Sequence, residues 1–205
     1  EMLRSLVGSE MCIRDSYNYE KACGNVSDML GSAANKWQEY LDIFDIELTR
    51  KPSQYDQYEV YDRESQVSMF YHCVYRSFLF PTKFYEIDRD GSEVHYNTLA
   101  KEVRNGKLYT NIGFWDGQKT LFPLLSLVAT KDYEDILEGV YNSYQETGFL
   151  PKWLSPDERG LMPGTLVDSV IADAITKDIG NDLADDLLKA MIDSSEKESD
   201  DPHYC

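Results

Sequence analysis

The sequence predicts a mainly α fold of helical hairpins with a small β-hairpin insertion. Apolar residues recur at helical spacing through most of residues 25–191, and short loops separate the helical stretches. Residues 85–110 differ, because the turn-forming pairs Asp90-Gly91 and Asn105-Gly106 divide short β-branched or aromatic runs. At 205 residues and 42% hydrophobic content, the chain is large enough to bury one core.

Residues 1–16 are expected to lie outside this fold. Their sequence, EMLRSLVGSEMCIRDS, resembles a translated sequencing adaptor. A signal peptide is the competing interpretation, but it needs a basic start and a longer apolar core. We therefore predict one domain over residues 17–205, preceded by an artefact segment.

The net charge of the chain limits the kinds of partner that it can bind. A net charge of −17 argues against nucleic acid and anionic membranes, whose phosphates attract basic surfaces. The longest apolar run, residues 121–129, is interrupted by Pro123 and is far shorter than the roughly 20 residues that span a bilayer. We expect no membrane insertion and favour a neutral ligand such as a carbohydrate. The three histidines form no HxxxH or HExxH pattern of a zinc site.

The first predicted helices lie in residues 25–46 and 62–80. Each carries apolar residues at helical spacing, which predicts one buried face. Pro81 is expected to stop the second helix. The two predicted core faces comprise Met29, Ala33, Trp37, Tyr40, Leu41 and Phe44, and then Met69, Phe70, Cys73, Val74, Phe78 and Leu79.

Residues 113–128 begin with an aromatic and acidic pair directly before a helix. Asp116 has two interpretations, an N-terminal cap or a ligand for paired hydroxyls. A sugar site needs an aromatic face for the C–H surface of the ring and a carboxylate for its hydroxyls, and Trp115 with Asp116 supplies both. Lys119 follows three residues later.

The remaining helices are expected at residues 131–147, 165–177 and 182–191, with Gly148 ending the first of them. Between Gly148 and Gly164, several prolines and glycines predict an irregular loop. This loop holds Trp153 and Glu158. Proline and charge often mark a solvated connector, but loops on rigid scaffolds also carry chemistry.

Three motifs together resemble glycoside hydrolase family 92, the calcium-dependent exo-acting α-mannosidases. They are FYHCVYRSFLFP (70–81), GFWDGQKTLFPLLSLV (113–128) and LPKWLSPDERGLMPGTLVDSVIADA (150–174), in the order of the family. The resemblance implies part of an (α/α)6 toroid and a mannose-containing glycan as substrate. It also implies that the rest of the catalytic domain and an N-terminal β-sandwich domain are missing, and that calcium takes part, although its ligands are not located.

The resemblance also assigns roles to individual residues. Glu158 takes the position of the general acid, with Trp153 and Met162 expected to raise its pKa by desolvation. Trp115 and Asp116 correspond to a pair that holds the terminal mannose, while Lys119 stands where the family has an arginine and lacks its bidentate fork. Asp168 is a further candidate for substrate contact, with helix capping as the alternative.

The sequence leaves two alternative functions for the parent protein. The first is an inverting exo-α-mannosidase with Glu158 as acid, its general base lying outside this chain, so that the chain alone is inactive. The alternative is a noncatalytic carbohydrate-binding or interaction domain on the same helical scaffold.

Overall fold

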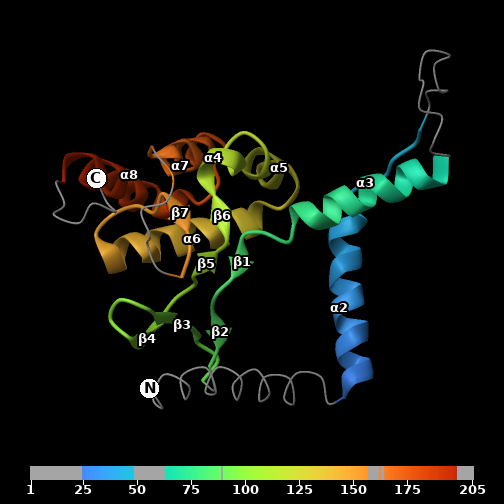
Figure 1. Cartoon of the computed structure of the whole chain (residues 1–205), viewed down its shortest axis with the longest axis horizontal. Coiled ribbons are helices and arrows are strands. Elements are labelled where there is room, and N and C mark those ends of the chain that lie inside the picture. Colours follow the sequence, from blue (N-terminus) through green and yellow to red (C-terminus); the bar gives the residue numbers. More distant parts are fainter. Residues whose placement is uncertain (1–24, 49–62, 89, 157–161, 163, 198–205) are drawn as a thin grey trace. The chain divides into compact units, whose positions relative to one another are not determined.

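The computed structural model describes residues 25–48, 63–88, 90–156, 162 and 164–197 (Figure 1). The chain is mainly helical with a few small sheets, as the sequence predicts. It divides into two compact units, Glu1–Ser77 and Phe78–Cys205. None of the described helices combines the length and hydropathy that a membrane-spanning segment needs.

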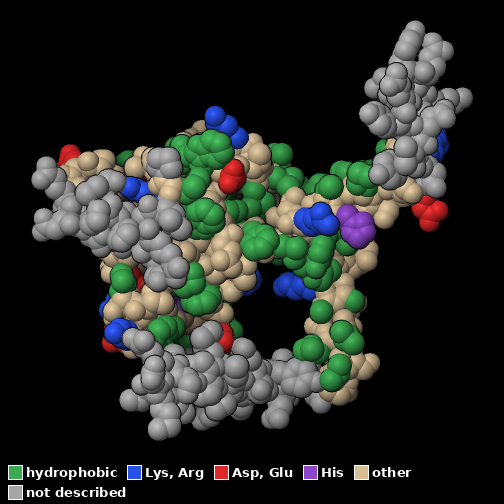
Figure 2. Space-filling model, viewed as in Figure 1, with side chains coloured by type: hydrophobic (Ala, Val, Ile, Leu, Met, Phe, Trp, Pro, Cys, Tyr) green, Lys and Arg blue, Asp and Glu red, His purple; other side chains and the backbone are tan. Residues whose placement is uncertain are grey.

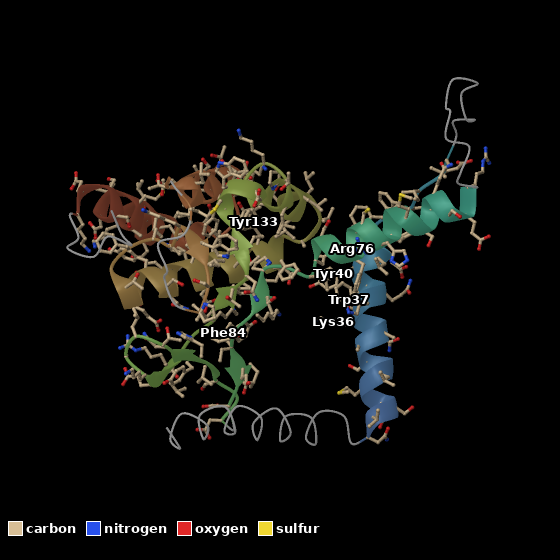
Figure 3. The ribbon with its side chains drawn as sticks, viewed as in Figure 1. Lys36, Trp37, Tyr40, Arg76, Phe84 and Tyr133 are labelled. Atoms are coloured by element: carbon tan, nitrogen blue, oxygen red, sulfur yellow. The ribbon has the colours of Figure 1, made fainter. Side chains whose placement is uncertain are left out.

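The first unit contains helices α2 (Val26–Leu41) and α3 (Arg63–Ser77). Helix α2 begins after Asn25, whose side-chain oxygen accepts a hydrogen bond of 3.0 Å from the backbone N–H of Asp28. The two helices meet through aromatic side chains: the rings of Trp37 and Tyr75 lie 4.4 Å apart. Figure 3 shows Trp37 and Tyr40 near Arg76, where the helices approach each other.

The two buried faces predicted for these helices are wrong. Helix α2 has no buried residue, and Val74 is the one buried residue of α3. Met29 is 38% and Met69 is 47% exposed, and Cys73 is also exposed. The helical spacing is present, but within the described residues each helix covers only a small part of the other. Apolar side chains consequently remain at the surface of both helices (Figure 2).

The second unit begins with the predicted strand insertion. Strands β2 (Glu86–Ile87), β3 (Glu93–Asn97) and β4 (Glu102–Asn105) form an antiparallel sheet in that order. A separate ladder pairs β1 (Thr82–Lys83) with β5 (Tyr109–Thr110). The predicted turns occur at Gly91 and Gly106, whose φ angles of 86° and 104° suit glycine.

Helices make up most of the remaining second unit. The predicted helix over residues 131–147 is confirmed as α6 (Thr130–Thr147), which ends at Gly148 in the left-handed conformation. The predicted last pair is observed as α7 (Leu166–Thr176) and α8 (Ala184–Glu196), joined by a short 3-10 turn (Asn181–Leu183). The segment after residue 113 divides into α4 (Phe114–Gly117) and α5 (Leu121–Val128).

The core of the second unit is aromatic and aliphatic. The rings of Phe114, Phe122 and Tyr133 are fully buried. The ring centroids of Phe114 and Phe122 lie 5.9 Å apart, and those of Phe122 and Tyr133 lie 5.4 Å apart. The Tyr133 hydroxyl donates a 2.8 Å hydrogen bond to the carbonyl of Val170, which joins α6 to α7. Tyr133 lies in the middle of this helical group in Figure 3. Helices α4 and α7 therefore rest on one packed core.

Candidate active site

Two segments that are distant in the sequence meet in a short antiparallel ladder. Strand β6 (Ile112–Gly113) pairs with β7 (Trp153–Leu154), so that Gly113 lies opposite Trp153. The backbone N–H of Asn111 extends the ladder with a 2.7 Å hydrogen bond to the carbonyl of Leu154. The prediction that residues 148–164 lack regular structure is thus wrong at β7. The ladder brings the Trp-Asp segment next to the start of the loop that carries Glu158.

Gly113 marks the point where the site residues converge. A methyl group on Gly113 would lie 3.7 Å from Cε3 of Trp153 and 3.8 Å from Oδ2 of Asp116. The indole and the carboxylate therefore both face the same position on β6. The short helix α4 follows Gly113 directly, which fixes Trp115 and Asp116 relative to Trp153.

Two of the residues on α4, Trp115 and Asp116, are available to a ligand. Trp115 is 60% exposed, and Asp116 is also exposed. The capping interpretation of Asp116 is wrong, because Thr120 precedes α5 and Gly113 precedes α4 at the N-cap positions. The Asp116 carboxylate makes no hydrogen bond to another described residue, while its backbone carbonyl accepts one from the Thr120 hydroxyl. Lys119 lies exposed in the turn between α4 and α5.

Asp168 lies in the first turn of α7, the helix that packs against α4. Its side chain is half-buried, and burial raises the pKa of the Asp168 carboxyl despite an opposing hydrogen bond with the Thr165 side chain. The backbone N–H of Asp168 donates to the Thr165 carbonyl at 3.1 Å. A desolvated carboxylate at this place costs folding stability, and such costs are typical of functional positions.

The predicted acid Glu158 lies outside the described residues, as do Asp157 and Arg159. Its predicted environment between Trp153 and Met162 stays a prediction. On the far side of this segment, Met162 and Gly164 have φ angles of 82° and 84°, so the chain turns sharply before α7.

A narrow pocket lies between Trp153 and the strand insertion. Its walls come from β3 and the turn after it, from the end of α6, and from β7 with the residues that follow. The lining residues are Asn97, Thr98, Leu99, Leu108, Ser143, Glu146, Thr147, Pro151, Trp153, Leu154, Ser155 and Pro156. Sequence reasoning missed the residues of β3 and α6 here, because an insertion with turn motifs looks the same whether it packs on a site or on the surface.

The described residues hold no cluster of metal-ligating side chains. Within residues 25–48, 63–88, 90–156, 162 and 164–197, no three His, Cys, Asp or Glu side chains lie close enough to hold a metal ion. The described donors do not fit a calcium site by themselves. No described residue is therefore assigned as a calcium ligand.

Comparison with known proteins gives one family. The model described as the glycosyl hydrolase family 92 catalytic domain matches residues 15–204. An inverting mannosidase of that family from Bacteroides thetaiotaomicron is 31% identical, with a TM-score of 0.77 over 92% of this chain and 24% of its own. None of the curated proteins matches the chain.

A second family 92 structure from the same organism, an α-mannosidase, supports the fold. It is 22% identical, with a TM-score of 0.70 over 93% of this chain and 24% of its own. The same α-mannosidase in complex with mannoimidazole gives 23% identity and the same TM-score of 0.70. The chain thus spans about a quarter of the length of the solved structures that it resembles.

Proposed function

The chain belongs to glycosyl hydrolase family 92, whose members are glycoside hydrolases with an (α/α)6 toroid, and on this premise we propose that it is part of an inverting exo-α-mannosidase. The proposed substrates are terminal α-mannosides of glycans. The observation that carries the proposal is the β6–β7 ladder, which sets Trp153 beside the Trp115-Asp116 pair. This geometry supports a sugar site at the entrance of the Glu158 loop.

Substrate binding is assigned to the residues around Gly113. The exposed indole of Trp115 offers a face for the C–H surface of a mannose ring. The Asp116 carboxylate, which no described donor occupies, accepts hydrogen bonds from ring hydroxyls. Lys119 supplies a positive charge and single hydrogen bonds rather than the fork of an arginine. Trp153 forms one wall, and Asp168 is a further hydroxyl contact.

The chemical step is assigned to Glu158 as general acid. In an inverting hydrolysis the protonated acid gives its proton to the departing glycosidic oxygen, and a second carboxylate takes a proton from the attacking water. The C–O bond to the aglycone breaks as the new C–O bond to water forms on the opposite face. We place the general base, and the β-sandwich domain implied by the resemblance, in parts of the enzyme outside this chain.

We also propose that the longer enzyme binds calcium, which the resemblance implies. When bound, such an ion draws hydroxyl oxygens of the sugar into fixed positions. Because the described donors do not form its site, no step is assigned to it here. Loss of activity on chelation, with recovery on adding calcium, is the expected result for the longer enzyme.

The proposal is tested by changing the acid in the longer enzyme. We expect Glu158→Gln to lower turnover of substrates with poor leaving groups by about 100-fold or more, with binding of mannose unchanged. Glu196→Gln, at an exposed glutamate at the end of α8, is the matched control and should keep the full rate. An undiminished rate for Glu158→Gln would refute the assignment of the acid.

The isolated 205-residue chain gives the second test. We expect it to release no mannose from any α-mannoside. Release of mannose by the purified chain would contradict the placement of the base outside it. Binding of mannosides by the longer protein without any turnover would instead favour the noncatalytic carbohydrate-binding domain.

A further inference from the structure

The turn between β3 and β4 is held by the side chain and the backbone carbonyl of Asn97. The buried Asn97 side-chain oxygen accepts hydrogen bonds from the backbone N–H groups of Leu99 at 2.9 Å and Ala100 at 2.8 Å. The Asn97 carbonyl accepts a third, from Lys101 at 2.8 Å. Thr98, the first residue of this turn, is thereby held between Asn97 and the residues that Asn97 binds.

The same strand is anchored to helix α6 by a buried histidine. His95 Nε2 lies 2.7 Å from Oε1 of Glu146, and Nδ1 lies 2.8 Å from the carbonyl oxygen of Gly106. A carbonyl only accepts hydrogen bonds, so Nδ1 carries a proton. The His95 side chain is 1% exposed, so these contacts lie in the interior of the second unit. The strand insertion and α6 therefore form one rigid support.

From this support, Thr98 reaches the segment after β7. Its hydroxyl donates a 2.8 Å hydrogen bond to the carbonyl of Pro156. On the other side, the Leu154 carbonyl accepts from Asn111 of the β6 segment. The chain is thus held on both sides immediately before the predicted acid, which follows Pro156 by two positions. Neither hydrogen bond is needed to close the β3–β4 turn.

We propose that Thr98 is a positioning residue for the general acid, acting through the carbonyl of Pro156. The inference rests on the proposed function, since it takes Glu158 as the acid. A proton donor must be held to within a fraction of an ångström of the departing oxygen, and a displacement of about 1 Å can cost 100-fold in rate. The hydrogen bond from Thr98 restrains the backbone at Pro156, two positions before the proposed acid.

The test compares substrates that differ in their need for acid catalysis. In the longer enzyme, Thr98→Val keeps the shape of the side chain and removes the hydroxyl. We expect kcat on mannosides with poor leaving groups to fall about 10-fold to 100-fold, with KM nearly unchanged. Aryl mannosides with good leaving groups need little protonation, so their kcat should fall less than 3-fold. Thr98→Ser should restore the rate.

The outcomes separate the two proposals. Equal losses on both substrates, or no loss on either, would overturn the role of Thr98 while a loss in Glu158→Gln still supported the acid. If Glu158→Gln keeps its rate, the proposed function itself fails. Should Thr98→Val not fold, Thr98→Ala replaces it; failure of both to fold would mean that the hydroxyl maintains the fold and would also count against the proposal.

Discussion

The two units of the chain use aromatic side chains in different ways. In the first unit, Trp37 contacts Tyr75 at a surface where both rings keep access to solvent. In the second unit, Phe114 stacks on Phe122, and the ring of Tyr133 contacts Phe122 at a tilt, with no exposed area on any of the three residues. The first unit has one buried apolar residue among its described residues, Val74, and the second unit holds every other one.

This difference indicates which unit can support the candidate site. Helix stability in proteins comes mainly from the burial of an apolar face, so α2 and α3 gain little from each other. Helices α4 and α7, by contrast, pack against each other on the buried core, and they carry Trp115, Asp116 and Asp168. We expect the rigidity required at the site to come from the packed core of the second unit, and matched substitutions in the two units test this.

The largest contrast is expected from a pair of leucines. Leu137 on α6 is fully buried, whereas Leu30 on α2 is 63% exposed. Leu137→Ala should lower the free energy of unfolding by about 2–5 kcal/mol, because it opens a cavity in the core. Leu30→Ala should change it by less than about 0.5 kcal/mol. Denaturant unfolding of the chain measures both, and similar losses would show that the first unit has a core of its own.

A pair of glycines is expected to give effects of opposite sign. A methyl group on Gly139 of α6 would lie 2.9 Å from the ring of buried Tyr109 and 3.3 Å from its backbone nitrogen, while one on Gly31 of α2 would meet nothing within 4 Å. Gly139→Ala should destabilise the chain by about 1–3 kcal/mol through overpacking. Gly31→Ala should stabilise α2 by up to about 1 kcal/mol through helix propensity. Melting curves of the two variants shifting in the same direction would contradict the comparison.

Three other glycines illustrate what the sequence could predict. Helix positions and glycine turns follow from local patterns, so α6 with its end at Gly148, and the turns at Gly91 and Gly106, were predicted correctly. The burial of a helix face depends on a partner outside that pattern. Helical spacing alone therefore gave the same prediction for α2, which buries nothing, as for α6, which buries five residues.

The candidate site was predicted in its residue types and not in its contacts. The motifs pointed to Trp115, Asp116 and Trp153, but a strand of two residues leaves no pattern, so the β6–β7 ladder that joins them was missed. Thr98 was missed for a related reason, because its hydrogen bond joins residues 58 positions apart. The role of Glu158 stays a prediction.

Two tyrosine hydroxyls sharpen the comparison further. Tyr133 donates to the carbonyl of Val170 at 2.8 Å in a buried setting, and Tyr71 donates to the carbonyl of Phe44 at 2.7 Å in a half-buried one. Tyr133→Phe should cost about 1–2 kcal/mol and Tyr71→Phe about 0.5 kcal/mol, because water replaces the lost partner only at the second site. Denaturant unfolding gives both values. A larger cost for Tyr71→Phe would reverse the assignment of the stable unit.

The smallest expected effect is on the loss of stability at low pH. Asp135 on α6 lies 3.0 Å from the Nζ atoms of both Lys107 and Lys131. Burial alone would raise the pKa of the Asp135 carboxyl, but the ammonium groups of Lys131 and Lys107 outweigh it and hold the pKa below its ordinary value of 3.8. A carboxyl with a lowered pKa in the folded state stabilises above its unfolded pKa, and that stability is lost as the pH falls through the folded value.

The sign of this effect predicts the behaviour of a neutral variant. Asp135→Asn should lower the free energy of unfolding at pH 7 by about 1 kcal/mol or less and flatten its decline below about pH 4, because the group that loses its charge is gone. Asp45→Asn, at an exposed carboxylate of the first unit, should change the free energy of unfolding at pH 7 by less than about 0.5 kcal/mol. Denaturant unfolding at a series of pH values compares the three proteins. If Asp135→Asn left the decline of stability in acid as steep as in the unchanged protein, the ion pairs of Asp135 on α6 would not contribute to acid stability.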